Sequence, residues 1–378
     1  MQNHSDTDVL IVGGGPAGLA AAMAARHKGF RVMVADCARP PVDKACGEGL
    51  MPDGVDALRE LGINLDSMEA FPFRGIRFRD GAQAVEATFR EGRGIGVRRP
   101  VLHAAMASAA ECAGATLLWG ARVTGVTQDG VWFGNEQVTA RWIVGADGGN
   151  SRIRLWAGLQ NDARERRRFG FRRHYQIAPW TDCMELYWGR NAQVYATPVS
   201  ATEVCMVVVS RDSRLRLAQA LAEFPALEAR LRRANTTTPE LGAVTASRSL
   251  PRVVRGRVAL IGDASGAVDA ITGEGLCLSF RQALALAAAL ERGDLSAYQA
   301  AHRRLMRRPS WMSALLLSLD GRPWLRHFAL GLLQAQPALF EHLLAIHTGL
   351  EGPEDLGARA LSAARQAFRV GPALLRRS

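Results

Sequence analysis

Three glycines mark the stretch of this chain whose residue types and spacing could do chemistry. Gly13, Gly15 and Gly18 stand in residues 8–36 with the spacing GxGxxG. Glycines in this pattern permit a tight turn, let the backbone approach a pyrophosphate, and allow a helix to pack closely on a strand. Asp36 follows at the distance from which a carboxylate can accept hydrogen bonds from a ribose. We predict a dinucleotide site; the alternative is a glycine-rich turn in some other α/β unit.

The elements that must position these glycines are a strand, a helix and a second strand. Residues 9–12 are apolar and predict a buried parallel strand. An Ala-rich run to residue 28 predicts a helix, whose first turn holds Pro16 and Ala17 and whose free N–H groups attract phosphate. Gly29 is a helix stop, and residues 31–35 predict the second strand.

Two more stretches combine glycine with aspartate after an apolar strand. They are GADGGNSRIR (residues 145–154, with Asp147) and VALIGDASGAVDAITGEGL (residues 258–276, with Asp263). Asp263 directly follows a buried strand, whereas Asp147 could also cap the following helix through its side chain. Because a strand-rich region separates these two stretches, we expect the nucleotide domain to be discontinuous in sequence.

The predicted fold class is α/β, with a Rossmann-like nucleotide-binding domain, an inserted and mostly antiparallel β domain for substrate, and a helical C-terminal region. Residues 1–70, 95–160 and 250–300 form the first domain, residues 71–94 and 161–249 the second, and residues 301–378 the helical region. A hairpin is expected around Asp80 and Gly81. Residues 38–54 read as an irregular loop, residues 137–139 and 142–144 as two short strands, and residues 215–233 as one amphipathic helix.

Composition limits the class of protein. The net charge is +11, and Lys28 and Lys44 are the only lysines among 47 Lys and Arg residues. The basic runs are short, so we expect solvated faces and no nucleic-acid partner. Six cysteines without a CxxC pair predict no structural disulfide and no metal site, which favours a cytoplasmic location. No apolar run reaches the length of a membrane span.

The three glycine-containing stretches together resemble FAD-dependent oxidoreductases with the p-hydroxybenzoate hydroxylase fold. The resemblance covers residues 8–300 and rests on GGGPAG with Asp36, GADGGNSRIR and VALIGDASGAVDAITGEGL. It implies FAD as the cofactor. Two branches compete: aromatic hydroxylases, which use NAD(P)H and O2, and geranylgeranyl-reductase-like flavoproteins, which reduce carbon–carbon double bonds. The loop KACGEGL (residues 44–50) and the TGEG stretch resemble the reductase branch, but its YxWxFP motif and the halogenase WxWxIP motif are both missing.

The resemblance also implies roles for single residues. Arg99 would contact the pyrophosphate side, although the adjacent Arg98 could substitute for it. Asp147 would lie near the pyrophosphate and Asp263 against the ribityl hydroxyls. Backbone N–H groups at Gly273 and Gly275 would face the N1 end of the flavin. The remaining residues expected to contact the cofactor are Cys46, Gly47, Val123, Gly262 and Leu276.

Cys46 is the candidate for a chemical role. The resemblance places it beside the flavin, where its thiol could donate a proton, steer substrate or simply pack. Glu274 is expected to be a turn residue facing solvent, with an acid near the flavin as the alternative. The eight histidines have no convincing partner in sequence. Seven aromatic residues of the strand-rich insert favour an apolar or aromatic substrate, namely Phe169, Phe171, Tyr175, Trp180, Tyr187, Trp188 and Tyr195.

The predicted function is therefore an FAD-dependent oxidoreductase, and first a monooxygenase that uses NAD(P)H and O2 on an apolar or aromatic small molecule. The first alternative is a double-bond reductase, which Cys46 would support. The second is a flavoprotein that modifies a partner protein, with the Arg-rich C-terminal helices as its docking surface.

Overall fold

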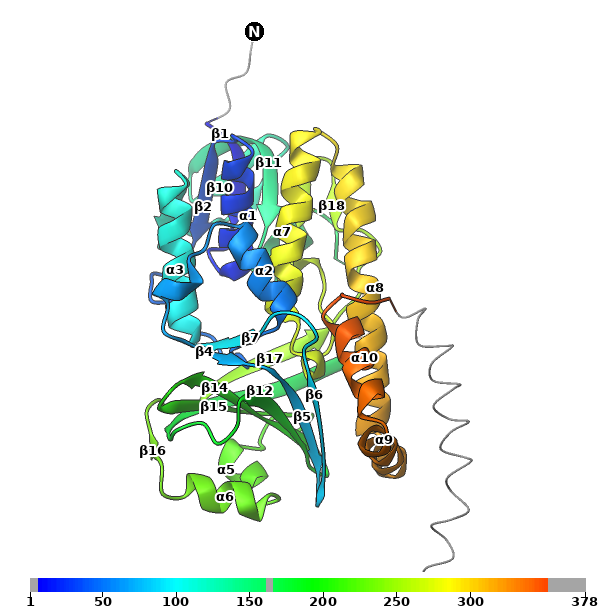
Figure 1. Ribbon diagram of the computed structural model, residues 1–378. Coiled ribbons are helices and arrows are strands. Elements are labelled where there is room, and N and C mark those ends of the chain that lie inside the picture. The colour runs from blue at the N-terminus through cyan, green and yellow to red at the C-terminus, as the bar shows by residue number, and fades with distance from the viewer. Residues whose placement is uncertain (1–5, 161–165, 353–378) are drawn as a thin grey trace, which may run out of the picture.

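The computed structural model describes residues 6–160 and 166–352. The upper half in Figure 1 is built on a largely parallel sheet. Its strands follow the order β18 (Val254–Arg255), β19 (Val258–Leu260), β11 (Glu136–Gly145), β1 (Thr7–Val12), β2 (Val32–Asp36) and β8 (Thr116–Trp119). Only β18 runs antiparallel to its neighbour on this path. The predicted β–α–β unit around the three glycines is confirmed.

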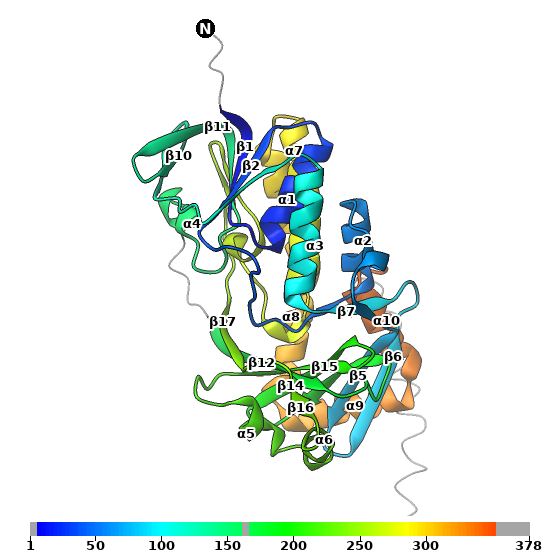
Figure 2. The ribbon, with the colours of Figure 1, turned by 90° about the vertical axis from the view of Figure 1, so that its left-hand side faces the viewer.

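Three helices pack together beside this sheet (Figure 2). They are α1 (Pro16–His27), α3 (Arg99–Cys112) and α7 (Gly275–Glu291). Nine of the twelve residues of α1 are buried, because small Ala and Gly side chains let neighbouring elements approach it from several sides. The other face carries β9 (Gly125–Val126), β10 (Gly130–Phe133) and the short helix α4 (Arg152–Trp156).

The lower half holds a second sheet that is antiparallel except where β5 pairs with β13. Its order is β16 (Asn235–Thr236), β12 (Arg166–Gln176), β15 (Glu203–Ser210), β14 (Ala192–Ser200), β13 (Cys183–Trp188), β5 (Gly75–Asp80) and β6 (Gln83–Thr88), with β17 (Leu241–Ser247) also beside β12. Strands β5 and β6 form the predicted hairpin. One face of this sheet carries a separate apolar core with α5 (Leu217–Leu221) and α6 (Pro225–Leu231).

Short elements join the two halves. Strands β3 (Gly49–Leu50), β7 (Gly94–Val97) and β4 (Ala70–Phe73) form a three-stranded sheet, and α2 (Pro52–Glu60) follows β3. The 3₁₀ turns are η1 (Leu65–Ser67), η2 (Gly262–Ser265) and η3 (Ala270–Thr272). Residues 38–54, predicted to be irregular, therefore contain β3 and the start of α2.

Three C-terminal helices run down one side of both halves (Figure 1). They are α8 (Leu295–Asp320), α9 (Pro323–Ala335) and α10 (Pro337–His347). In the described chain no single helix is long and apolar enough to cross a membrane; only α9 and α10 taken together approach this, and they are bent by 108°. The helical prediction for the C-terminal region is confirmed as far as residue 347, and residues 353–378 lie outside the described chain.

Two other predicted elements differ from the structure. The single helix expected over residues 215–233 is two short helices, because Pro225 cannot continue α5 and instead begins α6. The strands expected at residues 137–139 and 142–144 are one continuous strand, β11, which pairs with β10 at its start and with β1 along most of its length.

Candidate functional site

The glycine loop between β1 and α1 is shaped by backbone contacts. Gly13 has φ +113°, and a Cβ there would lie 2.3 Å from the carbonyl oxygen of Ala146. A Cβ on Gly18 would lie 1.8 Å from the Gly13 oxygen, whereas one on Gly15 would meet no protein atom within 4 Å. Gly13 and Gly18 are therefore required by the fold itself, and Gly15 borders open space at the start of α1, where Pro16 is buried.

Asp36 holds the glycine loop from the end of β2. Its carboxylate accepts hydrogen bonds from the backbone N–H of Gly14 (2.6 Å) and of Ala38 (2.7 Å). His103 of α3 contacts the same loop, with Nε2 2.9 Å from the Gly14 oxygen, and burial lowers the pKa of this imidazole. Asp36 thus has a structural role in addition to the predicted ribose contact, and His103 is a residue that no local motif indicated.

Arg99 is the first residue of α3, as the sequence predicted. Its backbone N–H donates to Glu48 Oε1 (3.0 Å), and its buried side chain leaves Nε without a partner among the described residues. The neighbouring Arg98 lies 3.5 Å from the carboxylate of Glu203 on β15. Arg98 is engaged with the second sheet, which leaves Arg99 as the better candidate for an anionic ligand.

Asp147 caps α4. Its carboxylate accepts hydrogen bonds from Ser151 Oγ (2.5 Å) and from the backbone N–H of Arg152 (2.7 Å) and Ile153 (3.1 Å). The capping alternative raised by the sequence therefore describes the observed contacts. Arg154 connects this turn to the third glycine-containing stretch, because its guanidinium donates to the Ala264 carbonyl at 3.1 Å.

Asp263 stands in η2 with a side chain that is 45 % exposed, and its carboxylate lies 3.4 Å from Lys44 Nζ. This pair brings the KACGEGL loop to the third glycine-containing stretch. Gly262 has φ +57°, and a Cβ there would lie 2.8 Å from the Cβ of Ala17. Of the other predicted contact residues, Val123 is buried, Leu276 is half-buried, and added Cβ atoms at Gly47, Gly273 and Gly275 would meet no protein atom within 4 Å.

Glu274 does not face solvent, and that expectation was wrong. It is only 2 % exposed, and its carboxylate lies 3.3 Å from Arg308 of α8 and 3.5 Å from Nδ1 of His347 of α10. Burial raises the pKa of Glu274 to about 8 and lowers that of His347 to about 4. The C-terminal helices α8 and α10 cover the start of α7. The local sequence TGEG resembles an exposed turn because it does not indicate this distant cover.

A buried ionic cluster fixes the KACGEGL loop on the second sheet. Glu48 accepts hydrogen bonds from Arg172 (2.8 Å), and its other oxygen lies 2.6 Å from Nε2 of His174; both partners are on β12. Arg172 also bonds Asp43, at 2.7 and 2.8 Å. His174 therefore has a partner that the sequence did not reveal. Glu48, His174 and the buried Cys205 could in principle bind a metal ion, but the Arg172 charge already neutralises the carboxylate and disfavours a cation.

Cys46 lies within this loop and is half-buried. Its sulfur accepts a hydrogen bond from the Glu48 backbone N–H at 3.4 Å, and the Cys205 thiol lies 3.9 Å from its carbonyl oxygen. Cys46 therefore contacts the Glu48 backbone through its sulfur and Cys205 of β15 through its carbonyl oxygen, and it does not line the apolar pocket described next.

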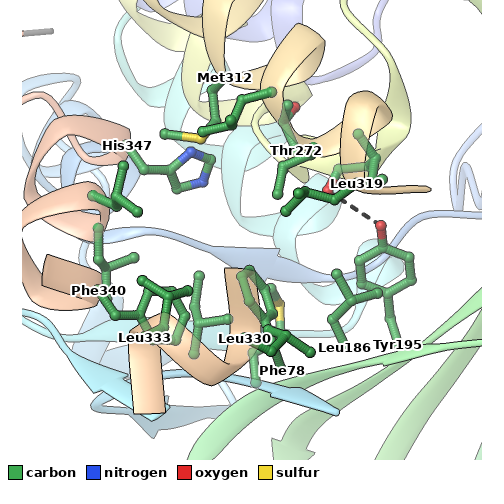
Figure 3. Close-up of a pocket in the computed structure, with 17 residues that line it drawn as sticks. Phe78, Leu186, Tyr195, Thr272, Met312, Leu319, Leu330, Leu333, Phe340 and His347 are labelled. Atoms are coloured by element: carbon green, nitrogen blue, oxygen red, sulfur yellow. Dashed lines mark hydrogen bonds between the residues drawn. The ribbon is translucent and has the colours of Figure 1, made fainter. Parts of the chain in front are cut away.

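An apolar pocket opens between the second sheet, η3 and the C-terminal helices (Figure 3). Its cavity volume is about 70 Å³. Its walls come from five parts of the chain, namely β5 (Ile76, Phe78), β13 and β14 (Met184, Leu186, Tyr195), η3 (Ile271, Thr272), α8 (Met312, Leu315, Leu316, Leu319) and α9 with α10 (Leu330, Leu333, Phe340, Leu343, Leu344, His347). Figure 3 shows His347 at the upper left of the pocket, Thr272 at the upper right and Tyr195 at the right, with Met312 at the top and Phe340, Leu333 and Phe78 below.

The aromatic residues of the strand-rich insert do not line this pocket as a set. Only Tyr195 does so, and its hydroxyl donates to the Ile271 carbonyl at 3.2 Å. Phe171, Tyr175, Trp180 and Tyr187 instead belong to the separate core with α5 and α6. Successive strand residues point to opposite faces, and these aromatics fall on the face away from the upper half.

These features fit an FAD molecule. The open space at Gly15, the free Nε of Arg99 and the open backbone at Gly273 and Gly275 provide room and N–H donors for phosphates and a ring. Asp263 is placed to accept hydrogen bonds, and its side chain is partly accessible. Helix α7 begins at Gly275, shortly after Thr272 of the pocket lining.

Comparison with known proteins agrees with this arrangement. The model of the family described as "FAD binding domain" matches residues 6–294. The chain belongs to this family. It is accordingly an FAD-dependent oxidoreductase with the p-hydroxybenzoate hydroxylase type of fold. The flavoprotein/dehydrogenase of Cytophaga hutchinsonii has a similar structure, with TM-score 0.77, 18 % identity, and coverage of 91 % of this chain and 93 % of that chain.

Curated relatives of this family member include both reductases and hydroxylases. Menaquinone reductase of Mycobacterium tuberculosis is 33 % identical over 40 % of each chain, so the match spans less than half of that protein. Digeranylgeranylglycerophospholipid reductase 1 of Methanothermobacter thermautotrophicus is 26 % identical over 78 % of this chain and 80 % of its own length. A 3-(3-hydroxy-phenyl)propionate/3-hydroxycinnamic acid hydroxylase of Mycobacterium sp. is 29 % identical over 43 % and 31 % of the two chains.

Proposed function

We propose that this flavoprotein is a monooxygenase that takes electrons from NAD(P)H and oxygenates an apolar small molecule. The observation that carries the proposal is the apolar pocket at the start of α7. Its walls are almost entirely aliphatic, which suits an apolar substrate. His347 and Thr272 are the polar groups that could orient one hydrogen-bonding group of such a substrate.

The residues proposed to hold FAD lie around the glycine loop and the start of α7. Gly15, which borders open space, would let the pyrophosphate approach the start of α1, while Gly13 and Gly18 shape the loop and Arg99 is the cationic partner. Asp36 and Asp263 would accept hydrogen bonds from the ribose and the ribityl chain. FAD, when bound, supplies the chemistry of accepting hydride from NAD(P)H and passing electrons onward.

The ionisable groups of the pocket favour oxygenation over reduction. Reduction of a carbon–carbon double bond needs a proton donor beside the substrate. Burial lowers the pKa of His347 to about 4, which leaves this imidazole neutral at pH 7, and burial raises the pKa of Tyr195 well above its ordinary value. Both are weak acids, and Cys46 lies outside the pocket lining. Oxygenation instead requires a pocket that excludes water, which aliphatic walls provide.

A double-bond reductase is the second candidate. It is favoured by the position of Cys46 in the loop that contacts both halves, and by the reductases among the relatives. Modification of a partner protein is a third possibility and would require that partner for turnover.

The purified protein should contain about one non-covalent FAD per chain.

Oxygen consumption by this protein distinguishes the monooxygenase from the reductase. With NAD(P)H and a series of phenols carrying alkyl tails of increasing length, we expect substrate-dependent O2 uptake and incorporation of one oxygen atom from ¹⁸O2 into the product. Anaerobic turnover of a polyprenyl substrate without oxygen incorporation would overturn the monooxygenase assignment in favour of the reductase.

A further inference from the structure

Helix α9 presents two large aromatic side chains to the outside. Trp324 is 70 % exposed and Phe328 is 65 % exposed, and they are the two most exposed of the large hydrophobic residues in the described chain. Four residues apart on a helix, they lie on one face. Exposed aromatic residues gathered in one place mark an interaction surface more often than singly scattered ones do.

The opposite face of the same helix lines the apolar pocket. Leu330 and Leu333 are buried and contribute to the pocket wall, and Arg326 is held inward by Asp80 at 2.7 Å. Helix α9 lies at the lower end of α8 beside the β5–β6 hairpin (Figure 1). A single helix therefore separates the pocket from the surroundings of Trp324 and Phe328.

The surface around the start of α9 is basic. Arg322 is exposed immediately before the helix, and Arg211, whose side chain is 70 % exposed, lies 3.8 Å from Asp320 at the end of α8. Arg214 follows with a side chain that is 92 % exposed. Asp320 is mostly buried, at 14 % exposure, so Arg322 and Arg211 present accessible positive charge near the start of α9.

We propose that α9 docks the protein on the surface of an anionic membrane, with Trp324 and Phe328 in the interfacial layer and Arg322 and Arg211 against lipid phosphates. Tryptophan favours this layer, and arginines are attracted to anionic leaflets. An apolar substrate partitions into a bilayer, and the membrane would then lie one helix away from the pocket. The proposed docking does not depend on whether the enzyme is a monooxygenase or a reductase.

Vesicle binding of the full-length holoprotein tests the proposal without any turnover. We expect co-sedimentation with vesicles of phosphatidylcholine and phosphatidylglycerol, and weaker binding to phosphatidylcholine alone. Trp324→Ser with Phe328→Ser should lower the partition coefficient at least about tenfold. Arg322→Gln should lower it about fivefold, and added salt should reduce that difference.

Leu155→Ser is the matched control, because Leu155 is 60 % exposed on α4 in the upper half, away from α9. It should bind vesicles as the unmodified protein does, and FAD content and thermal midpoint should be unchanged in all variants. Absence of vesicle binding, or equal binding by the Trp324/Phe328 double variant, overturns the proposal. Self-association that the double variant loses, without vesicle binding, would identify the face as a protein interface instead.

Discussion

The glycine loop at the start of α1 takes its shape from backbone atoms, whereas the apolar pocket takes its shape from side chains that come together from distant parts of the chain. At the loop, a Cβ on Gly13 or Gly18 would overlap carbonyl oxygens of Ala146 or of Gly13 itself. At the pocket, Phe78, Thr272 and His347 meet although they are far apart in sequence. The loop can serve any dinucleotide ligand of this shape, and the pocket determines which substrate is accepted.

Glu48 joins the start of α3 to the second sheet, and its removal should have the largest effect. Glu48→Ala would leave Nε2 of the buried His174 without this acceptor and the buried Arg172 with Asp43 alone, at a cost of about 3–5 kcal/mol in unfolding free energy. Chemical denaturation monitored by circular dichroism measures this. Asp56→Ala removes an ion pair with Arg59 in which both side chains are 63 % exposed, and it should cost less than about 1 kcal/mol. Equal losses in the two variants would contradict the importance of the buried cluster.

Two glycine substitutions separate the needs of the fold from those of the ligand. Gly18→Ala should destabilise the protein by about 1–3 kcal/mol even without FAD, because the new methyl group meets the Gly13 oxygen. Gly15→Ala should leave the apoprotein stable, since no protein atom lies within 4 Å, and should weaken FAD binding. Thermal unfolding of apoprotein and FAD titration measure both effects. Unchanged FAD affinity in Gly15→Ala would show that the pyrophosphate does not approach this position.

The buried Glu274 predicts a pH dependence of stability at the pocket end. Its pKa is raised from 4.5 to about 8, so its contribution to stability is fully present below pH 4.5 and is lost as pH rises through 8. His347 and His302 have pKa values lowered from 6.5 to about 4, so their contributions are lost only as pH falls below 6.5. Between pH 6.5 and 8, unfolding free energy should therefore fall by on the order of 2 kcal/mol.

Glu274→Gln should remove this decrease, because the amide does not titrate. If Glu274→Gln is less stable than the unmodified protein at pH 6.5, the thermal midpoints of these two proteins should converge as the pH is raised to 8. Parallel curves would mean that Glu274 is ionised throughout that range.

Cys46 should give the smallest effect if the pocket is an oxygenation site. Cys46→Ser should keep FAD, keep flavin reduction by NAD(P)H and keep most of the O2-dependent turnover, because the sulfur accepts a hydrogen bond from the Glu48 backbone and does not line the pocket. The exposed Cys37, changed to serine, is the matched control. Loss of turnover in Cys46→Ser alone, with flavin reduction intact, would support the reductase alternative.

The sequence by itself determined the β1–α1–β2 unit, the hairpin of β5 and β6, and the position of Arg99 at the start of α3. Each of these follows from neighbouring residues: glycine spacing, strand alternation, a turn, or a proline after a helix start. Asp147 was also anticipated as a capping residue. Contacts of this kind are set by local backbone geometry, which a short stretch of sequence specifies.

Only the tertiary structure decided the partners of Glu48 and the environment of Glu274. His174 lies 126 residues from Glu48, and their contact depends on how β12 packs against the KACGEGL loop. Glu274 is buried because α8 and α10 cover the start of α7, which TGEG does not encode. Successive residues of a strand point to opposite faces of the sheet, and packing decided which face of β13 meets which neighbour. Leu186 lines the pocket, and Tyr187 joins the separate core with α5 and α6. Such choices depend on the summed contacts of distant elements, and no local pattern records them.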